Sequence, residues 1–320
     1  MSSKVVSVID TGYESFEVER KILGEKGYTL QVFDGGRHDI IGKKAFAENS
    51  EGILMRWSQV DNDFLKDLPK LKAICRYGVG YDNINLEHAR QYGVKVANVS
   101  GYASHSVSDH TLMLLFSVLR DLHGSEGHLR KHYTQPGRKD SFELHEKTLG
   151  IIGLGRIGSM LCNKAKPLFK HILAYDPYIL DEKFNEVGAQ KASKEEILRQ
   201  SDVISIHCNL STSSENLIDS QEFELMEKKP ILINTARGGI VNEEALMQAL
   251  KEDKLFGVGI DVFKEEPPLE NLDPLFSHPN VIATGHNAWY SKEAQEELQL
   301  RAAKNMVAML LDEPCEDLLT

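Results

Sequence analysis

The sequence predicts an α/β protein with two domains, each built on a doubly wound parallel sheet. The chain has 320 residues, which is long for a single hydrophobic core. Short apolar runs of strand length alternate along it with amphipathic stretches of helix length. The alternation occurs as two series, and the second starts at Thr148. Two such domains place the expected site in a cleft between them.

In the first series, strand-like runs are separated by helical stretches and by single glycines. The expected strands are Val5–Asp10, Thr29–Phe33, Gly52–Trp57, Lys72–Tyr77 and Lys95–Val99. The expected helices are Ser15–Lys26, Lys43–Asn49 and Asn85–Tyr92.

Between the two series lies an apolar stretch, Ser104 to Leu122, which is too apolar for a surface helix and is predicted to be a buried one. The polar stretch that follows, Gly124–Lys147, is predicted as a helix end and a loop. The second series then repeats the alternation and ends in a helix from Ser291 to Leu311. Its expected strands are Thr148–Gly153, His171–Asp176, Val203–Cys208, Pro230–Ala236, Gly257–Val262 and Val281–His286. Its other expected helices are Ile157–Lys166, Ser193–Gln200 and Glu243–Glu252, and Ser193 and Glu196 have the spacing of a capping box.

Composition and charge exclude several classes of protein. The net charge of −11 argues against a nucleic-acid binder, which needs a basic face. No apolar run is long enough for a signal peptide or a membrane span, so we expect a soluble, cytoplasmic protein. The four cysteines lie far apart, so neither a disulfide framework nor a zinc site is expected. His128 and His132 have the spacing of a metal pair but no third ligand, and a solvated helix face is the better interpretation.

Residues 148–158, TLGIIGLGRIG, contain the strongest motif of the chain. Gly153, Gly155 and Gly158 follow a buried strand and open a helix, and Asp176 ends the next strand about twenty residues later. The first glycine permits a tight turn, the second lets a pyrophosphate approach the backbone, and the third lets the helix pack on the strand. The helix N-terminus favours phosphates, so the segment predicts a Rossmann-type dinucleotide site.

Asp176 indicates which dinucleotide binds. Its carboxylate can accept hydrogen bonds from ribose hydroxyls, whereas its charge would repel a 2′-phosphate. The expected cofactor is therefore NAD rather than NADP.

Three more strand ends of the second series carry residues suited to acid–base chemistry. ILINTARGGIVNE (231–243) brings Arg237 onto a Gly-Gly turn, GVGIDVFKEEPP (257–268) brings Asp261 and then Glu265 and Glu266, and NVIATGHNAWY (280–290) brings His286. Taken alone, each segment also has an interpretation without a functional role: a solvated arginine, an acidic surface turn and a structural histidine. Together they supply a carboxylate binder, a proton donor and an anion that favours the protonated form of the donor. Hydride transfer to a 2-keto acid needs these three kinds of group.

From RYGVGYDNINL (76–86) through SVSDHTLMLL (106–115) to HNAWYS, the sequence resembles the D-isomer-specific 2-hydroxyacid dehydrogenase family. The nearest branch includes phosphoglycerate dehydrogenases and the C-terminal-binding-protein corepressors. The resemblance implies an NAD-dependent oxidoreductase with Arg237 as carboxylate and carbonyl binder and His286 as acid/base. It selects Glu266 over Glu265 as the partner of His286, because the family's glutamate directly precedes proline.

The resemblance also implies further contacts. Residues expected near NAD are Val79, Gly153, Gly155, Arg156, Ile157, Gly158, Asp176, Cys208, Thr235, Ala236 and Asp261. Residues expected near the substrate are Arg56, Gly78, Val79, Gly80, Arg237 and Trp289. Arg56 and Trp289 are candidates from their own positions and not from the resemblance, and ordinary packing stays open as the alternative for both.

The family implies a Rossmann NAD domain, residues 102–289, inserted in a flavodoxin-like substrate domain of residues 1–101 and 290–320. It also implies a homodimer. From the histidine and cysteine spacing, no metal is expected. The chain departs from the family in Gly285, where proline is usual, in His207-Cys208-Asn209-Leu210 for His-x-Pro-Leu, and in Asp109-His110 for Glu-His. These departures bear on substrate fit and leave the reacting groups in place.

Two other functions fit parts of the sequence. An NAD-sensing corepressor-like interaction protein is the main alternative, because corepressors share the stretch around Trp289. Formate dehydrogenase is disfavoured, because that branch has glutamine in the place of Glu266.

Overall fold

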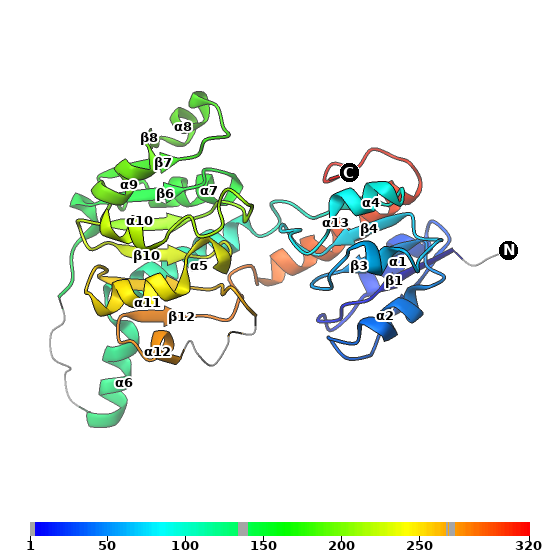
Figure 1. Ribbon diagram of the computed structural model, residues 1–320, viewed down its shortest axis with the longest axis horizontal. Helices are drawn as coiled ribbons and strands as arrows, with labels where there is room; N and C mark the ends of the chain where they lie inside the picture. The colour runs from blue at the N-terminus through cyan, green and yellow to red at the C-terminus, as the bar shows by residue number, and fades with distance from the viewer. Residues whose placement is uncertain (1–3, 134–139, 267, 269–272) are drawn as a thin grey trace. The chain divides into compact units, whose positions relative to one another are not determined.

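The computed structural model describes residues 4–133, 140–266, 268 and 273–320. The chain forms two compact units, Met1–Tyr102 with Ser291–Thr320, and Ala103–Tyr290. Each unit is an α/β domain with its own sheet (Figure 1). Residues 134–139 of the predicted polar loop, and Pro267 of the predicted proline pair, lie outside the described residues.

The described part of the first unit has a five-stranded parallel sheet in the order β2-β1-β3-β4-β5. This is the flavodoxin-like order, and the direction of winding reverses between β1 and β3. The strands are β1 (Lys4–Val8), β2 (Tyr28–Val32), β3 (Gly52–Met55), β4 (Ala73–Arg76) and β5 (Lys95–Ala97). The helices are α1 (Glu17–Gly24), α2 (Ile40–Ala47), α3 (Asn62–Leu65), α4 (Leu86–Gln91) and α13 (Lys292–Leu310).

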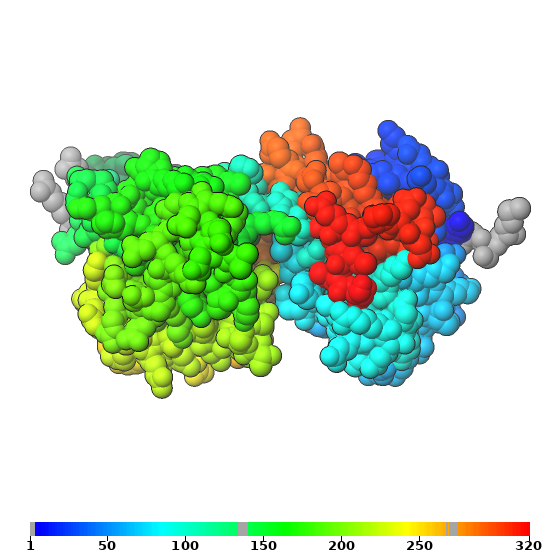
Figure 2. All heavy atoms as spheres, turned by 90° about the horizontal axis from the view of Figure 1, so that it is seen from above, coloured from blue at the N-terminus to red at the C-terminus, as the bar shows by residue number. Residues whose placement is uncertain are grey.

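Helix α13 returns to the first unit from the far end of the sequence. Its buried face, which includes Leu298, Ala302 and Met306, packs against β3 and β4. The chain then continues to Leu319, whose N–H donates to the carbonyl of Val96 in β5 at 2.8 Å. Figure 2 shows this red terminal segment lying against the cyan segment that contains β5.

The described part of the second unit has a seven-stranded parallel sheet in the order β12-β11-β10-β9-β6-β7-β8. Counted from β6, this is the Rossmann order with one further strand, and its winding reverses between β6 and β9. The strands are β6 (Thr148–Ile152), β7 (His171–Tyr175), β8 (Gln190–Lys191), β9 (Val203–Ile206), β10 (Ile231–Asn234), β11 (Gly257–Ile260) and β12 (Val281–Ala283). The helices are α5 (Ser104–Leu119), α6 (Leu122–His132), α7 (Arg156–Ala165), α8 (Asp181–Val187), α9 (Lys194–Gln200), α10 (Ser220–Glu224), α11 (Glu243–Lys251) and α12 (Asp273–Phe276).

Alternate residues of the central strands belong to two hydrophobic cores, one on each face of the sheet. In β10, Leu232 packs with residues of α9 and α11, whereas Ile231 and Ile233 pack with residues of α5 and α7. This two-residue alternation is the geometry of a strand that is covered on both faces. The predicted fold class is confirmed.

Helix α5 is buried, as the sequence predicts. Glycines in β11 let it approach the sheet closely: a Cβ at Gly259 would lie 2.9 Å from the Cβ of Leu114, and one at Gly257 would lie 2.5 Å from Val118 Cγ1. Larger residues at these positions would push α5 off the sheet.

The prediction of a helix end and a loop after α5 is right only in part, because its helical part is a separate helix, α6, over residues 122–132. No residue of α6 is buried, so it lacks the apolar periodicity that reveals a helix in sequence. The pair Glu126–Arg130, four residues apart, supports it locally. The predicted capping box at Ser193 is confirmed.

Among the residues that the structure describes, no helix is long and apolar enough to cross a membrane. They hold no group of three or more side chains suited to binding a metal ion.

Candidate active site and dinucleotide site

The glycine loop after β6 adopts a shape that side chains would disrupt. Gly153 has a φ of +93°, and a Cβ there would lie 2.5 Å from the backbone nitrogen of Cys208. A Cβ at Gly158 would lie 2.1 Å from the carbonyl oxygen of Gly153. Gly155 caps α7 and has open space around it, so a pyrophosphate has room beside the first N–H groups of the helix.

Asp176 lies beside this loop at the end of β7. Its carboxylate accepts hydrogen bonds from the backbone N–H groups of Leu154 at 2.9 Å and Tyr178 at 3.0 Å. These bonds hold the carboxylate at the carboxyl edge of the sheet, where a ribose bound at the α7 N-terminus would lie.

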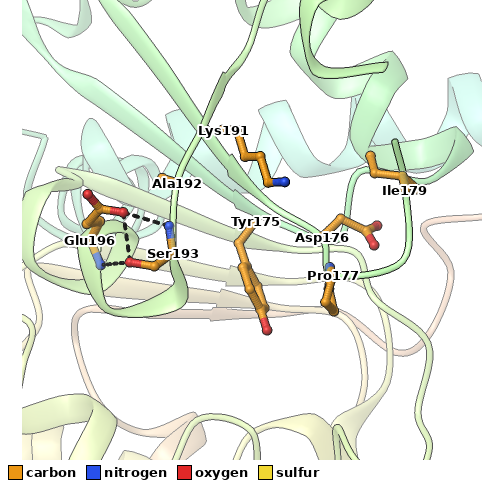
Figure 3. A pocket seen from close by; sticks show the side chains of 8 residues that line it. All are labelled: Tyr175, Asp176, Pro177, Ile179, Lys191, Ala192, Ser193 and Glu196. Carbon is orange, nitrogen blue, oxygen red and sulfur yellow. Dashed lines mark hydrogen bonds between the residues drawn. The ribbon is translucent and has the colours of Figure 1, made fainter. Parts of the chain in front are cut away.

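A hollow of about 330 Å³ opens next to Asp176, between the end of β7 and the start of α9 (Figure 3). The volume falls in the range of small-molecule sites. The lining residues are Tyr175, Asp176, Pro177, Ile179, Lys191, Ala192, Ser193 and Glu196. Its place beside the glycine loop suits the adenosine half of a dinucleotide.

Glu266 and His286 form a hydrogen-bonded pair, with 2.5 Å between Oε2 of the glutamate and Nδ1 of the histidine. Burial on its own would raise the pKa of Glu266, but the hydrogen bond and charge of His286, with the nearby charge of Arg237, lower it overall. Glu266 is therefore an anion at neutral pH. Because Nδ1 is engaged, Nε2 is the imidazole nitrogen that can exchange a proton with a substrate.

Arg237 follows β10 and lies near the same glutamate, whose pKa its charge helps to lower. The turn after it packs directly on the segment that leads to Glu266, since a Cβ at Gly238 would lie 1.9 Å from the carbonyl carbon of Phe263. The guanidinium also donates to the carbonyl of Ala236 at 2.8 Å. A cation, an anion and an imidazole thus gather at the carboxyl ends of β10, β11 and β12.

The loop that carries His286 is held by Asp261, which is fully buried. Its carboxylate accepts hydrogen bonds from the Thr284 hydroxyl at 2.6 Å and from the backbone N–H groups of Asn287 and Ala288 at 3.0 and 2.9 Å. Its carbonyl accepts the N–H of His286 at 2.7 Å. His286 itself has a φ of +52°, a left-handed conformation that costs free energy in a residue with a side chain. Asp261 therefore fixes the strained backbone of the candidate acid.

Two more side chains support this loop. His110 on α5 pairs with Thr284 through Nε2 and Oγ1 at 2.9 Å, and burial lowers its pKa although Asp261 opposes the shift. Trp289 donates its indole N–H to the carbonyl of His286 at 3.1 Å. Sequence reasoning missed these loop-holding contacts; an aspartate directly after the apolar strand β11 was the one signal for them.

Other residues expected near NAD lie on the same edge of the second unit. Arg156 and Ile157 begin α7, and Thr235 follows β10 with its hydroxyl 3.1 Å from that of Thr111. Burial raises the pKa of the Cys208 thiol to about 11, so this cysteine is a neutral side chain beside the glycine loop.

The remaining substrate candidates belong to the first unit. Gly78 has a φ of +129°, which favours glycine, and its carbonyl accepts the N–H of Val99 at 3.0 Å. The carbonyl of Val79 accepts from the Asn98 side chain at 2.6 Å. Arg56 directly follows β3, next to β4 in the sheet, so it shares the carboxyl edge with the turn of residues 78–80.

A Rossmann unit with a glycine loop, next to a glutamate–histidine pair and an arginine, defines the class of nicotinamide-dependent dehydrogenases. Comparisons with known proteins give the family. Residues 112–288 match the family described as "D-isomer specific 2-hydroxyacid dehydrogenase, NAD binding domain". The chain belongs to this family, and the predicted resemblance is confirmed.

Three relatives show the range of the similarity. D-3-phosphoglycerate dehydrogenase of Methanocaldococcus jannaschii is 36% identical over 83% of this chain and 51% of its own length. Glyoxylate reductase of Thermococcus litoralis is 36% identical over 78% of this chain and 77% of its own length. The D-lactate dehydrogenase of Aquifex aeolicus, solved with NAD and lactic acid, is 26% identical, with a TM-score of 0.87 over 97% of this chain and 96% of that one. The chain spans about half the length of the phosphoglycerate dehydrogenases that it matches.

Proposed function

We propose that the protein transfers a hydride between NADH and a small 2-keto acid, giving the D-2-hydroxy acid, or catalyses the reverse reaction. The observation that carries this proposal is the Glu266–His286 pair beside Arg237, in the unit that holds the glycine loop. The chain's own residues fit the cofactor, because the cradle at Gly153 and Gly158 admits no side chain. NAD(H), when bound, supplies or accepts the hydride.

In this mechanism the three side chains have separate tasks. Arg237 binds the substrate carboxylate and polarises the keto oxygen with a planar, permanently charged group. His286 donates the proton from Nε2 to that oxygen as it becomes a hydroxyl, and accepts it in the reverse direction. Glu266 orients the imidazole through Nδ1 and stabilises its charged form.

Further residues take supporting roles in the proposal. In the second unit, Gly155, Arg156, Ile157, Asp176, Cys208, Thr235 and Ala236 would surround NAD. Asp261 would reach the nicotinamide end while holding the His286 loop. In the first unit, the turn Gly78-Val79-Gly80 would offer N–H groups to the substrate carboxylate, and Val79 would also touch the cofactor. Trp289 would border the substrate.

The direct experiment is a panel of 2-keto acids assayed by NADH oxidation and repeated with NADPH. We expect turnover of at least one acid with NADH and at least tenfold lower kcat/KM with NADPH, because Asp176 repels a 2′-phosphate. The variant Asp176→Ser should narrow this difference. Comparable use of both cofactors by the unchanged protein would refute the assignment of NAD.

The corepressor alternative is not favoured, since the relatives carry the names of dehydrogenases and reductases. A pull-down with corepressor-binding peptide motifs, run beside the keto-acid panel, would detect that activity. All four cysteines are unpaired, which supports a cytoplasmic location, where disulfides are rare.

We also propose a homodimer. Helix α6 buries none of its residues, and Leu122, Leu129 and Tyr133 on and beside it are 59%, 54% and 86% exposed. Apolar side chains on an uncovered helix suit contact with a second copy. Light scattering of the purified protein should give twice the mass of the chain, and Leu129→Glu should reduce it toward the monomer. A monomeric mass for the unchanged protein across micromolar concentrations would contradict this.

His207 gives a prediction about acid stability. Burial lowers the pKa of its imidazole from 6.5 to about 3, while Nε2 pairs with Ser205 Oγ at 2.8 Å. The unfolded chain takes up a proton near pH 6.5 and the folded one only near pH 3, so the unfolded state binds more protons in this window. The free energy of unfolding should therefore fall as the pH drops below 6.5, by up to about 1.4 kcal/mol per pH unit.

Urea denaturation between neutral pH and about pH 5 measures this slope. The variant His207→Gln should flatten it, whereas His123→Gln, an exposed histidine on α6, should leave it unchanged. An equal slope in the protein and in His207→Gln would show that other groups cause the acid sensitivity.

A further inference from the structure

The turn of residues 78–80, which the proposed function assigns to the substrate carboxylate, is held through its carbonyl oxygens. The carbonyl of Gly78 accepts the N–H of Val99 at 3.0 Å. The carbonyl of Val79 accepts from the side-chain amide of Asn98 at 2.6 Å. Both donors belong to the segment that directly follows β5, so this segment fixes two successive peptide groups of the turn.

These two hydrogen bonds also set the direction of the N–H groups in the turn. A trans peptide group is planar, and its N–H and carbonyl point in opposite directions. Because the carbonyls of Gly78 and Val79 face the segment after β5, the N–H groups of Val79 and Gly80 point away from it. Among the described residues, neither of these N–H groups has an acceptor. The turn thus presents two successive donors, an arrangement that suits a carboxylate.

The turn needs support from outside, because glycine restricts its own backbone least. Gly78 and Gly80 flank Val79, and Gly78 has a φ of +129°. A peptide group next to glycine rotates at little cost, and such a rotation would exchange the directions of its N–H and its carbonyl. The bonds to the carbonyl oxygens oppose that rotation.

The peptide group between Asn98 and Val99 is held at both ends. Its N–H donates to Gly78, and its carbonyl accepts from the side-chain amide of Asn305 on α13 at 2.9 Å. Hydrogen bonds that share one peptide group polarise it and strengthen each other. A side chain of α13 therefore acts on the turn through a single peptide group.

The chain beyond α13 completes this arrangement. The Asn305 amide also donates to the carboxylate of Asp317 at 2.9 Å, and the hydroxyl of Ser100 donates to the same carboxylate at 2.5 Å. The carbonyl of Asp317 accepts the N–H of Asn98 at 3.3 Å. We call Asn98, Asn305 and Asp317 the Asn98 network.

Asp317 is the charged member of the network. Its side chain is almost completely buried and pairs with the guanidinium of Arg301 at 2.6 Å. Burial on its own would raise the pKa of Asp317, but hydrogen bonds from Ser100, Asn305 and Arg301 lower it overall, so the carboxylate is an anion at neutral pH. The guanidinium also donates to the carbonyl of Ser100 at 2.7 Å. The segment after β5 is therefore fixed at both Asn98 and Ser100.

Stability alone does not account for the buried amides. Asn98 and Asn305 are 6% and 8% exposed, and Asn305 lies beside the apolar Met306 on the buried face of α13. The hydrogen bonds of a buried amide do little more than offset its desolvation, so an apolar side chain would stabilise this helix at least as well. A fully hydrogen-bonded buried network does specify one arrangement of the chain. Here that arrangement includes the substrate turn.

We infer that Asn98, Asn305 and Asp317 are positioning residues for the turn of residues 78–80. They hold its peptide groups so that the N–H groups of Val79 and Gly80 face the substrate carboxylate. Resting on the proposed function, this makes carboxylate recognition depend on α13 and on the chain after it. None of the three side chains touches the substrate or takes part in hydride or proton transfer. Their loss should therefore appear mainly in the KM for the keto acid.

The first test is Asn98→Asp in the full chain, assayed with NADH and the keto acid of highest kcat/KM. The variant keeps the shape of the side chain but replaces its donor by an oxygen, which repels the carbonyl of Val79. We expect KM to rise about tenfold or more, with kcat and the Kd for NADH within about threefold. Asn305→Leu should raise KM in the same direction. Lys95→Met, which removes a hydrogen bond from β5 to the Met309 carbonyl of α13, is the matched control and should leave KM unchanged.

A double substitution distinguishes positioning from a general loss of stability. Asn98 and Asn305 act on the turn along one path, so their combined rise in KM should be clearly smaller than the product of the two single rises. The Tm of each variant gives its stability. Unchanged KM in both single variants, or a KM that follows Tm across all variants including Lys95→Met, would overturn the inference.

Amide hydrogen exchange separates this inference from the proposed function, because it needs no turnover. Without substrate, the N–H of Val99 should exchange at least about fivefold faster in Asn305→Leu than in the unchanged protein. The N–H of Val94, which donates to Ala89 in the same unit, should exchange equally in both. Faster exchange at Val99 without turnover of any keto acid would contradict only the proposed function. Turnover with KM and exchange unaffected by Asn305→Leu would contradict only this inference.

Discussion

His286→Ala is expected to lower kcat for 2-keto acid reduction by about a hundredfold or more, while the Kd for NADH changes less than about threefold. The variant loses the imidazole nitrogen placed to deliver a proton beside Glu266 and Arg237, but leaves the glycine loop intact. Steady-state kinetics gives kcat, and quenching of protein fluorescence by NADH gives the Kd. His171→Ala, an exposed histidine at the start of β7, is the matched control.

Glu266, the partner of His286, allows a test that distinguishes an electrostatic role from a purely structural one. The pKa of Glu266 lies below its ordinary value, so an anion faces the imidazole through the neutral range. Glu266→Gln removes this anion and can keep the hydrogen bond, so reduction should lose rate at a lower pH than in the unchanged protein. Near-normal turnover in His286→Ala, or identical pH profiles with Glu266→Gln, would refute these roles.

Arg237→Ala is the second variant expected to have a large effect, with kcat/KM for the keto acid reduced about a hundredfold or more. Both parameters should change, because the guanidinium would bind the carboxylate and also polarise the keto oxygen. Arg237→Lys keeps the charge but loses the planar pair of donors, so it should recover only part of the rate. Added guanidinium ions should raise the rate of Arg237→Ala and not that of Arg237→Lys.

The control for this arginine is Arg199→Ala. Arg199 is a partly exposed arginine of the same unit that pairs with Glu195. If Arg237→Ala stays within about threefold of the unchanged protein in both kcat and KM, another group must hold the carboxylate.

The sequence predicts some parts of this molecule well because they depend on local chemistry. The glycine loop at 153–158 and the capping box at Ser193 involve residues that are close in sequence, and few other local structures require the same spacing. The two parallel sheets follow from the alternation of apolar strands and helices.

Other parts depend on contacts between distant segments, and no spacing reveals them. The sequence cannot show that Asp261 holds the loop of His286, or that Asn305 on α13 holds Asn98 after β5. The left-handed backbone of His286 is likewise imposed by its surroundings, since only a small fraction of residues with a side chain adopt a positive φ. Helix α6 is hard to predict for a different reason. None of its residues is buried, so its sequence lacks the apolar periodicity of a packed helix.

The return of α13 to the first unit has a consequence for how the chain folds. The second unit is one continuous segment, whereas the core of the first unit needs Leu298, Ala302 and Met306, which are separated from β5 by the whole of residues 103–290. Such remote contacts raise the contact order of the first unit and slow its closure. During synthesis, its sheet must wait for α13 to emerge, with one face of β3 and β4 still uncovered. A folded second unit lowers the entropy cost of this closure, because it holds the two ends of its own segment at fixed positions.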